Sequence, residues 1–160
     1  MSTFDQARAV TFRIGADLFA VDVQGVERVV RYVTPRPVPR LPDWIEGIVE
    51  LDGRVIPVVD IRRRLGAEVT DAGAQTRLLL LALDGDWCAM VVDQVLDVRP
   101  YAAGELAPPP GLVRGLAGSL VLGTLRRGSA LVLLLDAAHL FSASERLALV
   151  ASGVTEAANA

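Results

Sequence analysis

The stretch from Ile45 to Gly66 constrains the fold of this chain more than any other part of the sequence. It contains two segments rich in apolar, β-branched residues, separated by the pair Asp52-Gly53. An Asp-Gly pair between two such segments predicts a β-hairpin with a tight turn. Pro57 has no backbone N–H, so it predicts an edge or bulge position for the second strand. Asp60 follows that strand and is expected to cap a short helical turn.

Short apolar segments recur along the rest of the chain, and the run that starts at Phe19 matches the run that starts at Cys88 in its apolar pattern. Each run leads into a proline-rich connector, a glycine turn, an apolar strand, an aspartate and a short helical segment. The sequence therefore predicts two β subdomains, at about 10–75 and 76–141, followed by a capped helix within 142–151. Strands so short and numerous favour closed barrels. Besides the hairpin, strands are predicted at 9–14, 18–23, 26–33, 76–83, 87–92, 94–99 and 130–135, with an extended connector at 34–44.

Composition excludes several classes of protein. A chain of 160 residues fits one domain or two very small ones that share a core. Its apolar runs are far shorter than a membrane span, so no membrane insertion is expected. No secretory signal is evident, and a single cysteine allows no internal disulfide, so a reducing cytoplasm is the expected location. A net charge of −3 and an aromatic content of 5% argue against binding nucleic acid.

The residues that could carry chemistry are few. Asp60 and Asp136 occupy equivalent places in the repeat, which would suit a hydrolase with paired carboxylates, but neither lies in a D-T-G or D-S-G turn and both are expected to be caps. His139 is expected to be a packed or surface imidazole and Cys88 a small core residue. The run Arg62–Arg64 is expected to be a solvated helix face. No phosphate loop, dinucleotide fingerprint or zinc spacing is present, so no catalytic residue, metal or cofactor is expected.

Five segments in order carry a resemblance to a known family. The stretches F-R-I-G-A-D-L-F-A-V-D-V-Q-G-V-E-R-V-V, the proline connector, W-I-E-G-I-V-E-L-D-G-R-V-I-P-V-V-D-I-R-R-R-L-G, M-V-V-D-Q-V-L-D-V and the P-P-P segment resemble the CheW family of bacterial chemotaxis coupling proteins, from about Val10 to Phe141. The resemblance implies a mainly β fold of two intertwined five-stranded SH3-like barrels. It also implies a non-catalytic cytoplasmic adaptor, recruited to membrane-associated arrays, that links the signalling tips of methyl-accepting chemoreceptors to the regulatory domain of the histidine kinase CheA.

The resemblance also implies site residues. Carried over by position, the receptor-facing candidates are Val26, Arg28, Gly47, Asp52 and Val98, and the kinase-facing candidates, on the first barrel, are Val38, Leu41 and Val55. Each has a structural alternative: the two valines Val26 and Val98 would fit a barrel core equally well, and the glycine could serve only a backbone angle.

Two charges are reversed relative to the family pattern. Where the family usually reads N-L-R-G this chain reads E-L-D-G, and where it usually has an acidic residue in V-x-E-I this chain has Arg28 in V-E-R-V. We therefore expect Arg28 and Asp52 to form an ion pair of inverted polarity. The alternative is that Asp52 is simply a good turn residue and Arg28 a solvated side chain. Two other functions stay open: a coupling protein of a pathway that does not govern flagellar swimming, and a hydrolase, which would require Asp60 and Asp136 to converge in one cleft.

Overall fold

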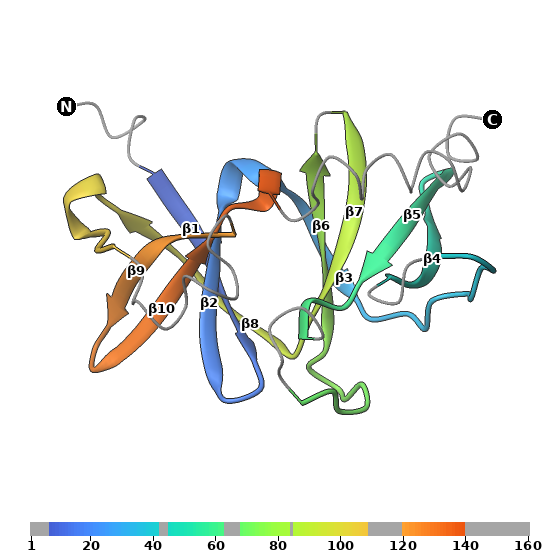
Figure 1. Ribbon diagram of the computed structural model, residues 1–160, viewed down its shortest axis with the longest axis horizontal. Coiled ribbons are helices and arrows are strands. Elements are labelled where there is room, and N and C mark those ends of the chain that lie inside the picture. The colour runs from blue at the N-terminus through green and yellow to red at the C-terminus, as the bar shows by residue number, and fades with distance from the viewer. Residues whose placement is uncertain (1–6, 42–44, 63–67, 84, 109–119, 140–160) are drawn as a thin grey trace.

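The computed structural model describes residues 7–41, 45–62, 68–83, 85–108 and 120–139, which form two five-stranded sheets (Figure 1). Each sheet forms one barrel, and we name each barrel after the first of its strands in the sequence. The β1 barrel has the order β8-β1-β2-β10-β9, and the β3 barrel has the order β3-β6-β7-β5-β4. Their strands are β1 (Ala7–Ile14), β2 (Asp17–Asp22), β8 (Gln94–Tyr101), β9 (Val121–Arg127) and β10 (Ala130–Leu135), and β3 (Val26–Arg31), β4 (Ile45–Leu51), β5 (Arg54–Val59), β6 (Arg77–Leu83) and β7 (Asp86–Val92).

The mainly β fold and the two SH3-like barrels predicted from the sequence are confirmed, and the predicted strands are found within a few residues of their expected ends. The second strand ends one residue early because Asp22 caps a 3₁₀ turn (η2, Val23–Gly25), its Oδ1 accepting the Gln24 N–H at 2.9 Å. Strand β9 was not predicted. Two further 3₁₀ turns are η3 (Ala103–Glu105) and η4 (Ala137–His139). The predicted helix within 142–151 lies outside the described residues.

The two sheets do not divide the chain at its midpoint. Strand β3 leaves the barrel of β1 and β2 and pairs with β6, while β8 returns from the other half to pair with β1. The two sheets have equivalent strand orders. Exchanging each strand of β1 to β5 with its counterpart in β6 to β10 (β1 with β6, and so on) converts the order of one sheet into that of the other. The predicted repeat units at 10–75 and 76–141 and the two sheets are therefore different divisions of the chain, and the barrels are intertwined through exchanged strands (Figure 1).

Three apolar clusters follow from this topology. One lies between the sheets and joins residues of both, including Phe12, Phe19 and Leu135 from the β1 barrel and Leu79 and Met90 from the β3 barrel. Each barrel also has its own cluster, which includes Leu134 in the β1 barrel and Leu78 in the β3 barrel. Because the largest cluster is shared, the two barrels are packed as one body.

The hairpin of β4 and β5 has the predicted form, but its second strand is not at the edge of the sheet. Strand β5 lies between β4 and β7, so the predicted edge position is wrong for the strand as a whole. The parallel ladder from β5 to β7 contains only Val58 and Val59, and Pro57 comes just before it. At Pro57, strand β5 is therefore paired with β4 but not with β7. This explains why an inner strand tolerates a residue without a backbone N–H.

Candidate partner-binding surface and the polar network between the barrels

The expected contact between Arg28 and Asp52 is present. Arg28 lies on the edge strand β3, and its guanidinium donates a short hydrogen bond to the carboxylate of Asp52 in the β4–β5 turn. The side chains are 42% and 61% exposed, so the ion pair contributes only about 0 to 1 kcal/mol to stability. It joins the two edges of the β3 barrel on a surface open to a partner.

Asp52 also serves the turn. Its φ is 51° and that of Gly53 is 75°, so both central residues of the hairpin are left-handed, as a type I′ turn requires. Aspartate tolerates that conformation better than most residues. The alternative explanation of Asp52 as a turn residue therefore holds together with the ion pair, whereas Arg28 is not simply a solvated side chain.

Gly47 is constrained by a close approach of backbone. The connector after β3 forms an isolated antiparallel bridge with β4, in which Arg36 and Ile48 exchange hydrogen bonds of 2.8 and 3.0 Å. A Cβ on Gly47 would lie well inside van der Waals contact with the Arg36 carbonyl oxygen, and the φ of Gly47 is 154°. The backbone angle is therefore not the only reason for a glycine at position 47: the absence of a side chain also leaves room for the connector backbone at Arg36.

The remaining candidates differ in exposure. Val26 is half-buried and packs against the cluster shared by the barrels, whereas Val98 is 48% exposed on β8, so the core alternative for Val98 is wrong. Among the kinase-facing candidates, Leu41 packs against the shared cluster, and Val38 and Val55 are half-buried. Arg28 and Asp52 are the two candidates that the structure joins by a direct side-chain bond.

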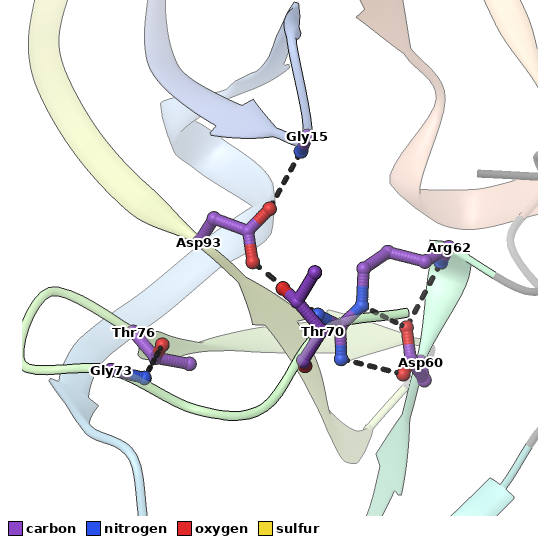
Figure 2. Close-up of polar contacts among 7 residues, drawn as sticks. All are labelled: Gly15, Asp60, Arg62, Thr70, Gly73, Thr76 and Asp93. Atoms are coloured by element: carbon purple, nitrogen blue, oxygen red, sulfur yellow. Dashed lines mark hydrogen bonds and ion pairs between the residues drawn. The ribbon is translucent and has the colours of Figure 1, made fainter. Parts of the chain in front are cut away.

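A buried polar network lies near the junction of the barrels (Figure 2). Asp60 is fully buried at the end of β5, and Arg62 binds it through Nε at 2.9 Å, Nη2 at 2.8 Å and its backbone N–H at 3.0 Å. Asp60 thus caps the helical turn as predicted. The expectation of a solvated Arg62–Arg64 face is wrong for Arg62, which is buried; residues 63 and 64 lie outside the described part of the chain.

The network reaches the other barrel through Asp93. The Nη1 group of Arg62 contacts the Thr70 carbonyl at 3.1 Å and Asp93 Oδ1 at 3.4 Å. Asp93 Oδ2 accepts the Gly15 N–H at 2.6 Å, and the Asp93 N–H donates to the Arg13 carbonyl at 2.9 Å. The chain is therefore tied from the end of β5 in one barrel to the β1–β2 turn in the other.

The ionisation of Asp60 follows from its partners. Burial alone would raise the pKa of the Asp60 carboxyl, but the hydrogen bonds with Arg62 and Glu46 and the charge of Arg62 outweigh burial and lower it. The hydrogen bond to Asp60 in turn raises the pKa of Arg62 against the opposing effect of burial. Both groups stay charged at neutral pH, and the pair is structural rather than open to a substrate.

Asp136 has the same capping role at the end of β10. Its Oδ1 accepts the Ala138 N–H at 3.1 Å, and its Oδ2 lies 2.5 Å from Nδ1 of His139, a surface imidazole that is 62% exposed. With Asp60 buried against Arg62 and Asp136 bonded within its own turn, the geometry gives no support to a hydrolase that uses both carboxylates. Cys88 is buried, as expected.

The described residues provide neither a metal site nor a membrane-spanning helix. They contain no group of three or more histidine, cysteine or acidic side chains placed to hold a metal ion. Within the same residues, no helix has both the length and the apolar character needed to cross a membrane.

Comparison with known proteins gives a consistent result. The family model of the CheW-like domain matches residues 8–145. "Chemotaxis protein CheW" of Treponema pallidum is 26% identical over 88% of this chain and 85% of its own length, and "Protein FrzA" of Myxococcus xanthus is 32% identical over 62% of each. The crystal structure of the scaffolding protein TtCheW from Thermoanaerobacter tengcongensis superposes with a TM-score of 0.79 at 26% identity, covering 88% of this chain and 90% of that one. With its intertwined barrels and a match over most of its length, the chain belongs to the CheW-like domain family.

Proposed function

We propose that this protein is a non-catalytic adaptor that couples methyl-accepting chemoreceptors to the histidine kinase CheA in a bacterial chemosensory array. The observation that carries the proposal is the family match over residues 8–145 together with the CheW-like pair of barrels. In this role the chain works in the cytoplasm at membrane-associated receptor arrays. The receptor tip would contact the surface of Val26, Arg28, Gly47, Asp52 and Val98, and the kinase regulatory domain that of Val38, Leu41 and Val55.

A binding experiment with both partners tests the coupling role. The full chain is titrated with the receptor signalling tip and with the CheA regulatory domain of the source organism, separately and together, by isothermal titration calorimetry. We expect each fragment to bind and the two to bind at the same time, because an adaptor must hold both. Failure of either fragment to bind, or mutual exclusion of the two, would refute the proposal.

The polarity of the Arg28–Asp52 pair deepens the proposal, because complementary charges at an interface select partners. Arg28→Glu or Asp52→Arg alone places like charges at the contact, and we expect each to weaken receptor-tip binding about tenfold, which is about 1.4 kcal/mol. The exchanged double variant restores a pair with the opposite charge order. We expect the two changes to couple favourably in stability, because the ion pair is restored, but not to recover affinity, since the receptor tip would still meet the two charges in the opposite order.

The control for this cycle is Arg28→Lys, which keeps the charge order and should leave binding within about twofold. If the double variant binds the receptor tip as well as the natural chain, only the presence of a pair matters and its polarity selects nothing. If the two single changes add without coupling in chemical denaturation, the pair contributes nothing to folding.

A second candidate function is the same coupling role in a chemosensory pathway whose output is not flagellar swimming, such as surface motility or gene expression. It is kept open because the chain is also similar to a relative that is not named a chemotaxis protein, "Protein FrzA" of Myxococcus xanthus, at 32% identity over 62% of this chain. Affinity purification of the tagged chain from its source organism, followed by identification of the kinase and receptors that accompany it, separates the two candidates.

A further inference from the structure

The chain passes from one barrel to the other at two places, and one of them is a single residue. Strand β2 of the β1 barrel is followed by η2 and then by β3 of the β3 barrel, so η2 makes the first crossing. Strand β7 of the β3 barrel ends at Val92, and β8 of the β1 barrel begins at Gln94. Asp93 alone therefore makes the second crossing, and a change in its backbone angles would turn one barrel relative to the other.

Asp93 is bonded to both barrels at this crossing (Figure 2). On the side of the β1 barrel, its Oδ2 accepts the Gly15 N–H at 2.6 Å, and its own N–H donates to the Arg13 carbonyl at 2.9 Å. On the side of the β3 barrel, its Oδ1 lies 3.4 Å from Nη1 of Arg62. The backbone and both carboxylate oxygens of the crossing residue are thus held by partners on the two sides.

The cation that meets Asp93 is itself fixed in place. The side chain of Arg62 is only 6% exposed, and Asp60 binds it through Nε at 2.9 Å and Nη2 at 2.8 Å. Its Nη1 also donates to the Thr70 carbonyl at 3.1 Å. Because the planar guanidinium is held at three nitrogens, Oδ1 of Asp93 has a defined place relative to the β3 barrel.

Apolar packing alone does not define the angle between the barrels. The cluster that the barrels share holds them together, but the hydrophobic effect depends on the area buried and has no preferred direction. Hydrogen bonds weaken steeply when they are bent, and those of a carboxylate are stronger than neutral ones. The contacts of Asp93 therefore select one angle among those that the shared cluster allows.

The two proposed binding surfaces depend differently on this angle. The kinase-facing candidates all belong to the β3 barrel and its connector. The receptor-facing candidates lie on both barrels, with Val98 on β8 of the β1 barrel and Val26, Arg28, Gly47 and Asp52 on the β3 barrel. A change of angle would therefore move Val98 relative to the rest of the receptor surface and leave the kinase surface intact.

We propose that Asp93 is a positioning residue for receptor binding, because its bonds to both barrels set the angle between the two parts of the receptor surface. Asp93 lies outside both proposed surfaces and acts through the geometry of the barrels. The inference rests on the proposed function, since it concerns the receptor surface described there. It predicts that loss of the Asp93 carboxylate lowers the affinity for one partner and not for the other.

Residual dipolar couplings of the ¹⁵N-labelled chain measure the angle without any partner. In the natural chain, one alignment should fit the amide couplings of both barrels. In Asp93→Ala each barrel should still fit by itself, but the two should fit together only after one is rotated relative to the other. Asp93→Asn keeps an oxygen for the Gly15 N–H and loses the charge that faces Arg62, so a smaller rotation is expected. This second variant carries the test if the alanine variant does not fold.

Isothermal titration calorimetry with the receptor signalling tip and with the CheA regulatory domain gives the second readout. We expect Asp93→Ala to weaken receptor-tip binding about tenfold and Asp93→Asn about threefold, with kinase binding within about twofold of the natural chain in both. A merely structural role would lower both affinities together or neither. If the natural chain binds neither fragment, the coupling role itself fails, and the dipolar couplings still decide whether Asp93 sets the angle.

The matched control is Asp136→Ala. Asp136 is also a carboxylate at the end of a strand, and it accepts the Ala138 N–H at 3.1 Å and contacts the His139 imidazole, but both contacts lie within its own turn. The control should leave the angle and the receptor affinity unchanged. The proposal is overturned if the barrels of Asp93→Ala keep the natural angle, if the receptor and kinase affinities fall by the same factor, or if Asp136→Ala has the same effects as Asp93→Ala.

Discussion

At the scale of single residues, the pair of Asp60 and Arg62 shows how a local cap becomes a link between barrels. The carboxylate caps its own helical turn, and the same guanidinium that neutralises it reaches Asp93 and so the turn at Gly15. A buried pair of this kind is costly to break, because removing one partner leaves a buried charge without compensation.

The lowered pKa of Asp60 predicts an acid-sensitive fold. A carboxyl whose pKa is lower in the folded state stabilises the fold fully above its unfolded pKa of 3.8, and this stabilisation is lost as the pH falls through the lower folded value. We expect the free energy of unfolding to decrease below about pH 4. Urea denaturation followed by circular dichroism across this range measures the effect.

The variant Asp60→Asn identifies the group responsible. At neutral pH it should cost about 3 to 5 kcal/mol, because Arg62 remains buried without its carboxylate, and it should reduce the acid dependence. Adding Arg62→Gln removes the unpaired charge, so the double variant should be more stable than Asp60→Asn alone. An Asp60→Asn chain with unchanged stability at pH 7 would contradict the structural role of the pair.

At the scale of elements, the contact between the connector and β4 depends on Gly47. Gly47→Ala would place a methyl group against the Arg36 carbonyl, and backbone cannot move aside as a flexible side chain can, so we expect a loss of about 1 to 3 kcal/mol in the free energy of unfolding. Chemical denaturation measures the loss. Gly73→Ala, which adds a methyl group in open space, is the control and should change stability by less than about 0.5 kcal/mol. Equal effects of the two changes would show that the close approach does not constrain the connector.

The sequence allowed most of the β-strands to be predicted, but not how the strands are arranged in the two sheets. The β4–β5 hairpin is specified locally by its Asp-Gly turn and β-branched residues, and it was found as predicted. Strand β9 was missed because V-L-G-T-L-R-R has a glycine and two arginines that break the apolar alternation. A signal was available, since Gly123 precedes Asp136 by the same 13 residues that separate Gly47 from Asp60. The exchange of β3 and β8 between the barrels could not be predicted from the sequence. The alternation of apolar and polar residues shows which face of a strand is buried, but not which strand lies beside it.

The candidate site was predictable to a similar degree. The contact of Arg28 with Asp52 follows from two compensating charge reversals, which can be read from the sequence once the family pattern is considered. The burial of Arg62 could not be read in this way, because a run of three arginines is typical of a solvated helix face. Its partner Asp93 is 31 residues away along the chain, and only the folded topology brings the two together.

At the scale of the whole molecule, the exchanged strands make each barrel depend on both halves of the chain. Strands β1 and β2 are completed by β8, β9 and β10, and β3, β4 and β5 are completed by β6 and β7. A chain cut between the repeats therefore leaves each half with unpaired strand edges and with half of the shared apolar cluster exposed. Unpaired edges and exposed apolar surface of this kind lead to unfolding or aggregation rather than to a stable half.

This dependence predicts that residues 1–75 and 76–160, expressed separately, do not fold, whereas the two fragments fold when mixed. Heteronuclear NMR of each fragment should show the narrow amide dispersion of an unfolded chain, and the equimolar mixture should recover the dispersed spectrum of the full chain, since every strand then regains its neighbours. Thermal unfolding of the intact chain should be a single cooperative transition for the same reason. A dispersed spectrum from either fragment alone would mean that one repeat closes a barrel without the strand from the other, and the exchange would then be a preference of the intact chain rather than a requirement for folding.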